Sequence, residues 1–286
     1  MLERGKMVNI IDAIINLVNN PIIEIKNFYN ERNRANSVGD SLEEYIKDLF
    51  VNSFYLNEQE RLEKISQFFS YLGNNSNPPD MMLRNGDAIE VKKMENITSE
   101  IQLNSSYPKE KLYSSSSMIS KECKIAEKWN EKDMLYIVGS IKKNKLEDLF
   151  FVYGIDYAAN EHIYRDLKDK LKEGINNTEG IEFSETKELG RINKIDPLGI
   201  TSLRIRGMWL LKNPWETFKY VYTKNKEKKF NFCAIVNDEK YNSFKNTDIL
   251  EKISSSNKSL VIKTIKIKNP NNPAKLRNAK MITFSL

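Results

Sequence analysis

Three side chains within one short stretch could together perform metal-assisted hydrolysis. Asp80 follows a pair of prolines, and Glu90 and Lys92 stand a few residues further along the chain. Residues 88–92 alternate between apolar and charged side chains, which predicts a β-strand with Glu90 and Lys92 on one face. Carboxylates provide the oxygen ligands that a hard divalent cation such as Mg²⁺ prefers. A lysine beside such a cation could orient or deprotonate a water molecule.

The turn before this strand decides whether Asp80 joins the other two residues. Asn85 and Gly86 form a strong signal for a β-hairpin turn. A two-residue turn would place Asp80 on the face opposite to Glu90. A three-residue loop over residues 84–86, with the glycine in the left-handed conformation, would place Asp80 directly across from Glu90. We predict this second register, or an equivalent bulge near Asp80.

In that register the two carboxylates would repel each other unless a cation lay between them, because Cβ atoms of paired strand residues are about 4.5–5.5 Å apart. An ordinary exposed hairpin with solvated charges is the alternative interpretation of the same residues. The rest of the chain must decide between the two.

Other catalytic chemistries are poorly supplied in this chain. The only histidine, His162, is expected at the start of a helix as a surface or capping residue. The two cysteines, Cys123 and Cys233, exclude a disulfide framework and a cysteine-rich zinc site. Serine triads and cysteine–histidine dyads each need a histidine in a specific partnership. Chemistry must therefore come from carboxylates, lysine and a metal ion.

The composition is that of a polar protein with a mild basic excess. The 286 residues include 45 Lys and Arg against 39 Asp and Glu, a formal charge of +6, which suits a polyanionic partner if the positive charge gathers on one face. No run of about 18 apolar residues occurs, so no transmembrane helix is expected. No signal peptide is evident, and a cytoplasmic location is expected.

Helices are expected before the hairpin. Apolar residues at helical spacing predict helices over residues 7–20 and 22–29, and a third helix that begins at Ser37. Glu43 lies at the edge of the apolar stripe of this third helix and could reach the carboxylate pair. Glu44 should point away from the pair.

The remaining elements complete an α/β (α+β) fold with a mixed central sheet flanked by helices. Strands are predicted over the ranges 65–71, 134–139 and 149–154, and helices over 118–129 and 161–173. In the tail, strands are predicted over 230–236, 259–268 and 280–286, with a loop over 269–280.

We divide the chain into a core of residues 1–222 and a β-rich tail of residues 223–286. The core contains N-terminal helices (7–56), the hairpin (78–93) and a recognition region (185–209). The tail forms either a subdomain or an extension of the main sheet.

Two segments could bind nucleic acid. Arg204 and Arg206 share one face of a predicted strand and could read guanine O6 and N7 atoms in the major groove; a solvated edge strand is the alternative. Lys187 and Arg191 are suited to phosphates. The polar segment 101–111 could hold a phosphate backbone through its hydroxyl, amide and lysine groups, although a generic polar loop is an equally fair interpretation. The full set of predicted DNA contacts is Arg204, Arg206, Lys187, Arg191, Asn104, Ser105, Ser106, Lys93 and Arg34.

The hairpin carries the pattern Pro-Asp, spacer, Glu-x-Lys, which resembles the PD-(D/E)xK nucleases. In that superfamily a glutamate from a preceding helix often joins the metal cluster, as Glu43 could here. The resemblance implies catalytic roles for Asp80, Glu90 and Lys92. The metal ligands would be Asp80, Glu90 and the backbone carbonyl of Val91.

Several further strings, in order, are similar to the NgoPII family of type II restriction endonucleases. They are GDSLEEY (39–45), NPPD (77–80), GDAIEVKK (86–93), LNSSYPK (103–109), ETKELGR (185–191) and LRIRGMW (203–209). The similarity extends to about residue 222.

This resemblance implies a homodimeric, Mg²⁺-dependent enzyme that cleaves palindromic double-stranded DNA at GGCC, with Mn²⁺ able to substitute. It also implies a cognate DNA methyltransferase in the same system, without a stable complex between the two enzymes. Two alternatives remain: a PD-(D/E)xK nuclease of DNA repair or recombination, and a non-catalytic DNA-binding protein on the same fold.

Overall fold

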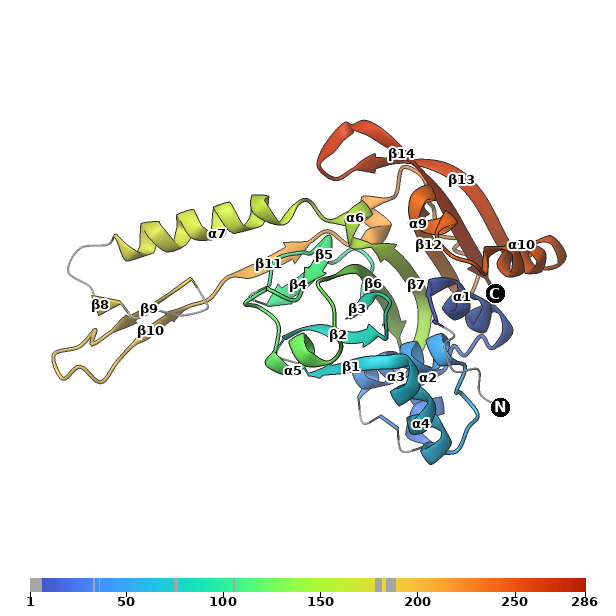
Figure 1. Ribbon diagram of the computed structural model, residues 1–286, viewed down its shortest axis with the longest axis horizontal. Helices are drawn as coiled ribbons and strands as arrows, with labels where there is room; N and C mark the ends of the chain where they lie inside the picture. The colour runs from blue at the N-terminus through green and yellow to red at the C-terminus, as the bar shows by residue number, and fades with distance from the viewer. Residues whose placement is uncertain are drawn as a thin grey trace.

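A large mixed β-sheet runs through the body of the protein, and helices pack against it (Figure 1). The computed structural model describes residues 7–32, 34–35, 37–74, 77–104, 106–177, 182–183 and 189–286. Within these residues the central sheet has nine strands, and its order is β1-β2-β3-β6-β7-β12-β14-β13, with β5 pairing with β6 off this path. The predicted fold class is confirmed.

The sheet is mixed because β3 runs parallel to β6, and β7 runs parallel to β12, whereas the other pairs are antiparallel. Its strands are β1 (Phe69–Asn74), β2 (Asn77–Leu83), β3 (Ala88–Met94), β5 (Lys111–Tyr113), β6 (Glu131–Lys142), β7 (Lys145–Tyr153), β12 (Asn231–Asn237), β13 (Leu260–Asn269) and β14 (Asn272–Ser285).

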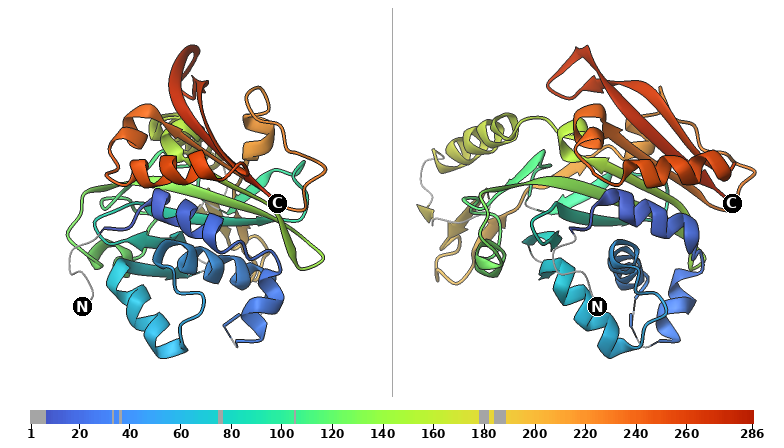
Figure 2. Two further views of the ribbon diagram at one scale, coloured as in Figure 1. Left: turned by 90° about the vertical axis from the view of Figure 1, so that its right-hand side faces the viewer. Right: turned by 45° about the vertical axis from the view of Figure 1, so that its right-hand side comes forward.

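The N-terminal helices pack together along one side of the sheet, as the blue ribbons in Figure 2 show. They are α1 (Ile10–Asn19), α2 (Ile25–Asn30), α3 (Val38–Val51) and α4 (Glu58–Phe68). Ser37 caps α3 by accepting a hydrogen bond from the Asp40 amide, as expected for a helix that begins there. The apolar stripe of α3 buries Leu42, Ile46 and Leu49 in the same core as Ile89 and Val91 of β3.

A second apolar core lies on the opposite side of the sheet. There, Met82 and Ala88 of the hairpin join Tyr136, Phe150 and residues from short elements. Those elements are β4 (Ile101–Asn104), α5 (Lys121–Ile125), α6 (Gly154–Tyr157), β11 (Met208–Leu211) and α8 (Pro214–Thr217). Because strand residues alternate, the side chains of Asp80, Glu90 and Lys92 belong to this second side.

The tail continues the main sheet. Strand β12 lies between β7 and β14, and β13 forms the edge, with α9 (Asp238–Asn242) and α10 (Thr247–Ser256) beside them. The loop predicted over 269–280 is instead a tight turn between two long strands. Pro270 suits such a turn because its ring fixes φ, and the Asn269 side chain accepts a hydrogen bond from the Asn271 amide at 2.9 Å.

An arm extends away from this body, at the left of Figure 1. It consists of α7 (Glu161–Asn176), β8 (Glu182–Phe183), β9 (Gly190–Asn193) and β10 (Leu203–Ile205). Strands β8, β9 and β10 form a small antiparallel sheet of their own. His162 is exposed near the start of α7.

Two other predictions were wrong in detail. The strand predicted from residue 65 begins only at Phe69, because α4 continues through a run of good helix formers after its Asn57 cap. The helix predicted over 118–129 shrinks to α5, which holds Cys123 in the core. None of the helices in the described ranges is long and apolar enough to cross a membrane.

Candidate active site

The hairpin of β2 and β3 brings Asp80 directly across from Glu90. Met81 pairs with Ile89, and Met82 pairs with Ala88, so the pairing passes through a three-residue loop over 84–86. The Leu83 amide closes this loop by donating to the Asp87 carbonyl at 2.9 Å. The predicted register is therefore confirmed.

One feature of the loop differs from the prediction. Asn85 adopts the left-handed conformation, with φ of 55°, and Gly86 does not. Asparagine tolerates this conformation better than other side chains do. The glycine is needed for a close approach instead, since a Cβ at Gly86 would lie 3.0 Å from the Leu83 Cβ.

Asp80, Glu90 and Lys92 form a compact, partly buried cluster. Asp80 Oδ2 accepts a hydrogen bond from the Val91 amide at 2.6 Å, which holds its carboxylate against β3. Glu90 is only 7% exposed, and its Oε1 lies 2.6 Å from the Lys92 Nζ. Glu90 Oε2 is buried and has no hydrogen-bond partner within the described part of the chain.

Burial, and repulsion from Glu90, destabilise the ionised form of the Asp80 carboxyl. Burial and the nearby charge of Glu90 raise the pKa of Asp80 from 3.8 to about 8, although Lys92 and the Val91 amide act in the opposite direction. Burial alone would lower the pKa of Lys92, but Glu90 and Asp80 outweigh it and raise that pKa. The cluster therefore has more negative charge than one lysine compensates.

Glu43, on α3, is a partly buried carboxylate that interacts electrostatically with this cluster. Burial raises the pKa of Glu43, and Lys92 is among the charges that lower it. Glu43 in turn contributes to the raised pKa of Asp80. Its neighbour Glu44 is held elsewhere, with Lys47 at 2.6 Å and Arg61 at 2.5 Å.

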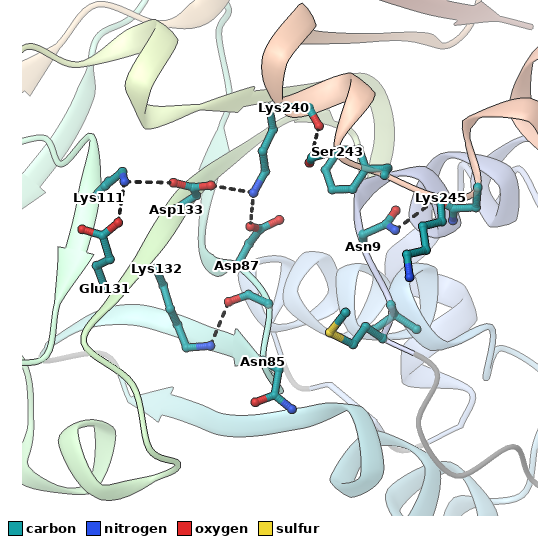
Figure 3. Close-up of a pocket in the computed structure, with 15 residues that line it drawn as sticks. Asn9, Asn85, Asp87, Lys111, Glu131, Lys132, Asp133, Lys240, Ser243 and Lys245 are labelled. Atoms are coloured by element: carbon teal, nitrogen blue, oxygen red, sulfur yellow. Dashed lines mark hydrogen bonds and ion pairs between the residues drawn. The ribbon is translucent and has the colours of Figure 1, made fainter.

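The turn end of the hairpin is anchored by a second group of charges, around a cavity of about 640 Å³ (Figure 3). Lys240 lies between Asp87 at 2.8 Å and Asp133 at 2.6 Å. The Tyr153 hydroxyl donates to the other Asp87 oxygen at 2.7 Å. Lys132 donates to the Leu83 and Gly86 carbonyls at 2.9 and 2.8 Å. These contacts fix the turn, and through it the position of β3.

The arm presents arginines on one face of a two-stranded ribbon. Arg191 of β9 pairs directly with Arg204 of β10. The neighbouring pair, Gly190 and Ile205, faces α7, because a Cβ at Gly190 would lie 3.0 Å from Ile175. Since successive strand residues point to opposite faces, the two arginines face away from α7.

The strand predicted to carry both Arg204 and Arg206 on one face is in fact two strands in different sheets. Strand β10 ends at Ile205, and β11 begins at Met208 and pairs with β4. Arg206 lies in the connection, and both Arg204 and Arg206 are exposed. The strand changes partner at Gly207, where an added Cβ would lie 3.3 Å from Leu189.

A family model described as NgoPII restriction endonuclease matches residues 8–268 of this chain. A type II restriction enzyme, NgoPII from Neisseria gonorrhoeae, is 60% identical over 279 residues, which cover 97% of this chain and all of that relative. The chain belongs to the NgoPII restriction endonuclease family. It is therefore a type II site-specific deoxyribonuclease, as the resemblance in the sequence implied. No solved structure matches it.

The matched range contains both the hairpin cluster and the whole arm. Membership in a restriction endonuclease family disfavours both alternatives left open by the sequence. Neither a repair nuclease nor a non-catalytic DNA-binding protein is a restriction endonuclease.

Carboxylate oxygens such as those of Asp80 and Glu90 in this NgoPII family member suit a divalent cation, which type II restriction enzymes generally use. Across the described residues, no three His, Cys, Asp or Glu side chains converge as a ready-made metal site. Mg²⁺ usually needs only one or two carboxylates, because waters and substrate phosphates complete its shell. Asp80 and Glu90, with the unpartnered Oε2 of Glu90, fit that requirement.

The other residues predicted to contact DNA occupy different positions in the enzyme. Lys93 is exposed on β3, 3.4 Å from Glu95. Asn104 ends β4, opposite Met208, and Ser106 follows at a half-buried position. Ser105 and Lys187 lie outside the described residues.

The surroundings of the Arg34 side chain contradict its predicted role in DNA binding. Its side chain is only 4% exposed, and its Nε lies 2.9 Å from Glu58. Its Nη1 and Nη2 donate to the Phe54 and Leu56 carbonyls at 3.2 and 2.7 Å. The guanidinium joins the chain before α3 to the end of that helix, so it has no face left for a phosphate.

Sequence reasoning missed Lys109 as an individual residue. It is 5% exposed, and its Nζ lies 4.5 Å from the centre of the Tyr107 ring. Burial lowers the pKa of Lys109, and the charges of Glu161 and Glu90 partly restore it. Because Lys109 is buried and interacts electrostatically with Glu90, it is a candidate for contact with a scissile phosphate. The only sequence signal was its place in the polar segment 101–111.

Proposed function

We propose that this enzyme hydrolyses phosphodiester bonds in duplex DNA with Mg²⁺, at a short palindromic sequence, which the family resemblance suggests is GGCC. The observation that carries the proposal is the pair of carboxylates, Asp80 and Glu90, opposite each other on one sheet face. Burial and repulsion from Glu90 raise the pKa of Asp80 to about 8. A cation between them would relieve that repulsion.

Asp80, Glu90 and the Val91 carbonyl would hold the cation, and Mn²⁺ would substitute for Mg²⁺. When bound, the cation supplies positive charge at the scissile phosphate and lowers the pKa of a nearby water. Lys92, whose Nζ lies 2.6 Å from Glu90 Oε1, would donate a hydrogen bond that orients the attacking water. Glu43 positions a second water or a second cation from α3. Lys109 would contact the phosphate.

We assign DNA binding to the arm, to Lys93 of β3 and to the segment 104–106. A two-stranded β-ribbon can enter the major groove, and the face of β9 and β10 that carries Arg191 and Arg204 is turned away from α7. Arg204 and Arg206 would contact guanine edges. The phosphate contacts would come from Arg191, Lys187, Lys93, Asn104, Ser105 and Ser106.

A palindromic target calls for a two-fold dimer, and α7 offers a surface for a second copy. Ile163, Leu167 and Leu171 follow one side of α7, and each is about half exposed. In an antiparallel pair centred near Leu167, Asp166 of one copy would lie beside Lys170 of the other. This side of α7 is therefore complementary to a second copy of itself in both apolar character and charge.

Sedimentation of a Leu167→Lys variant tests this dimer. We expect the variant to sediment as a monomer, because two lysines would face each other across the axis. Leu62→Lys, at an exposed leucine of α4, is the matched control and should remain dimeric. A Leu167→Lys dimer of unchanged stability would remove α7 from the interface.

The function as a whole is tested by digestion of a mapped plasmid, with Mg²⁺, with Mn²⁺ and with EDTA, followed by sequencing of the ends. We expect cuts at one palindromic sequence with either metal and none with EDTA. Plasmid modified by a cognate methyltransferase, which we expect to act without a stable complex, should resist cleavage. Cleavage of the same plasmid by Asp80→Ala would refute the assigned site.

A further inference from the structure

The tip of the arm presents large aliphatic side chains to solvent. Between β9 and β10, Leu198 and Ile200 are each 80% exposed, and Ile195 is 52% exposed. Single exposed aliphatic residues are common on protein surfaces, but clustered ones mark interaction sites. This cluster stands at the end of a projecting ribbon, the furthest part of the arm from the sheet in Figure 1.

The tip is held in a defined conformation. The Asp196 carboxylate accepts hydrogen bonds from the amides of Leu198 at 3.0 Å and Thr201 at 2.6 Å. The Ile195 amide closes the loop by donating to the Thr201 carbonyl at 3.1 Å. Gly199, with φ of +68°, permits the reversal. A loop fixed in this way loses little conformational entropy when its side chains are buried against a partner.

The charge of the ribbon selects the kind of partner. Arg191 and Arg204 lie across from each other just below the tip, and Lys194 and Arg206 lie at either end of the two strands. A second copy of the same ribbon would be repelled by this charge, whereas the phosphates of a nucleic acid would be attracted. The apolar tip and its cationic base therefore suit a duplex better than a partner subunit.

We propose that Leu198 and Ile200 form an apolar wedge that inserts into a base step of the bound DNA. The inference rests on the proposed function, because it concerns the same DNA complex. Phosphates and sugars offer little apolar surface, so the faces of the bases are the surface that two aliphatic side chains can cover. Proteins that insert leucine or isoleucine between base steps unstack and kink the duplex. The arginines of the ribbon would hold the flanking DNA during insertion.

The experiment uses duplexes that carry the cleavage sequence, with 2-aminopurine placed at successive positions inside and beside it. Fluorescence is measured without added metal, so that the DNA remains intact. We expect the wild-type protein to increase the fluorescence at one step, because 2-aminopurine brightens when it is unstacked. A Leu198→Ser/Ile200→Ser variant should bind about tenfold more weakly and leave the fluorescence at its free-duplex level at saturation.

A matched variant, Leu62→Ser/Ile249→Ser, replaces two exposed aliphatic residues elsewhere on the surface and should behave as the wild type does. Binding by the wild type without a fluorescence increase at any position would overturn the wedge and leave the proposed function standing. If the Leu198→Ser/Ile200→Ser variant is monomeric where the wild type is dimeric, the tip lies in a subunit interface. That result would also overturn the wedge. Failure of the wild type to bind or cleave any duplex would overturn the proposed function itself.

Discussion

Replacing Asp80 by asparagine should make the metal-free enzyme more stable at pH 8. The carboxamide has almost the same shape, and its oxygen can still accept the hydrogen bond from the Val91 amide that Asp80 accepts at 2.6 Å. What the substitution removes is a negative charge that faces Glu90 inside a partly buried cluster. Catalytic sites commonly carry such destabilising arrangements.

The magnitude follows from the pKa of Asp80. A carboxyl whose pKa is raised on folding contributes stability that is complete below its unfolded pKa and is lost as the pH rises to the folded value. For Asp80 this window runs from 3.8 to about 8. Full conversion of the shift at about 1.36 kcal/mol per pKa unit gives roughly 5 kcal/mol at pH 8.

Water and Lys92 rearrange around the charge in the native protein, so we expect a realised gain on the order of 2 kcal/mol. At roughly 2.1 cal/mol/K per residue for the entropy of unfolding, this gain corresponds to a rise in Tm of about 3 °C. At pH 5 the Asp80 carboxyl is already protonated, so the two proteins should differ much less.

The assay is thermal unfolding in EDTA at several pH values, for the wild type and Asp80→Asn. Glu227→Gln, at an exposed position in the loop before β12, is the control for loss of one negative charge and should shift Tm equally at every pH. A difference between Asp80→Asn and the wild type that is the same at pH 5 and pH 8 would refute the raised pKa of Asp80.

Three further outcomes are expected. Lys109→Met should lower kcat by about a hundredfold and leave DNA binding in EDTA nearly unchanged, since the residue would act at the scissile phosphate; an unchanged kcat would contradict this role. Gly190→Val should weaken DNA binding in a filter assay but preserve the Tm shift caused by Mg²⁺, because its side chain would collide with Ile175 in the arm; a loss of the metal response would mean that the arm and the cluster are not independent. Arg204→Ala should reduce discrimination against altered sites by about 1–3 kcal/mol, measured as relative cleavage rates, and unaltered preference would remove its role in reading the sequence.

The sequence specified the hairpin well because its information is local. Alternation over residues 88–92 assigned the faces of β3, and the turn at Asn85 and Gly86 left only two registers to consider. The apolar stripe of α3 placed Glu43 at the border of the core for the same reason. Patterns of this kind depend on neighbouring residues only, so they can be followed without knowledge of the tertiary structure.

Features that depend on distant partners could not be predicted in this way. Arg34 looked like a surface cation, but its partners are Glu58 and two carbonyls contributed by a later segment. The break at Arg206 arises because β11 pairs with β4, about a hundred residues earlier in the chain. Lys109 acquires its burial from the helices and strands around it, and its own neighbours in the sequence give no sign of this.

The central claim is that Asp80 and Glu90 jointly hold a divalent cation. Titration of Mn²⁺ into the enzyme with its duplex, followed by the loss of the free-ion electron paramagnetic resonance signal, measures this binding directly. We expect the wild type and Glu227→Gln to bind Mn²⁺ with similar affinity, and Asp80→Asn and Glu90→Gln each to bind it at least about tenfold more weakly. Equal Mn²⁺ affinity in all four proteins would contradict the account.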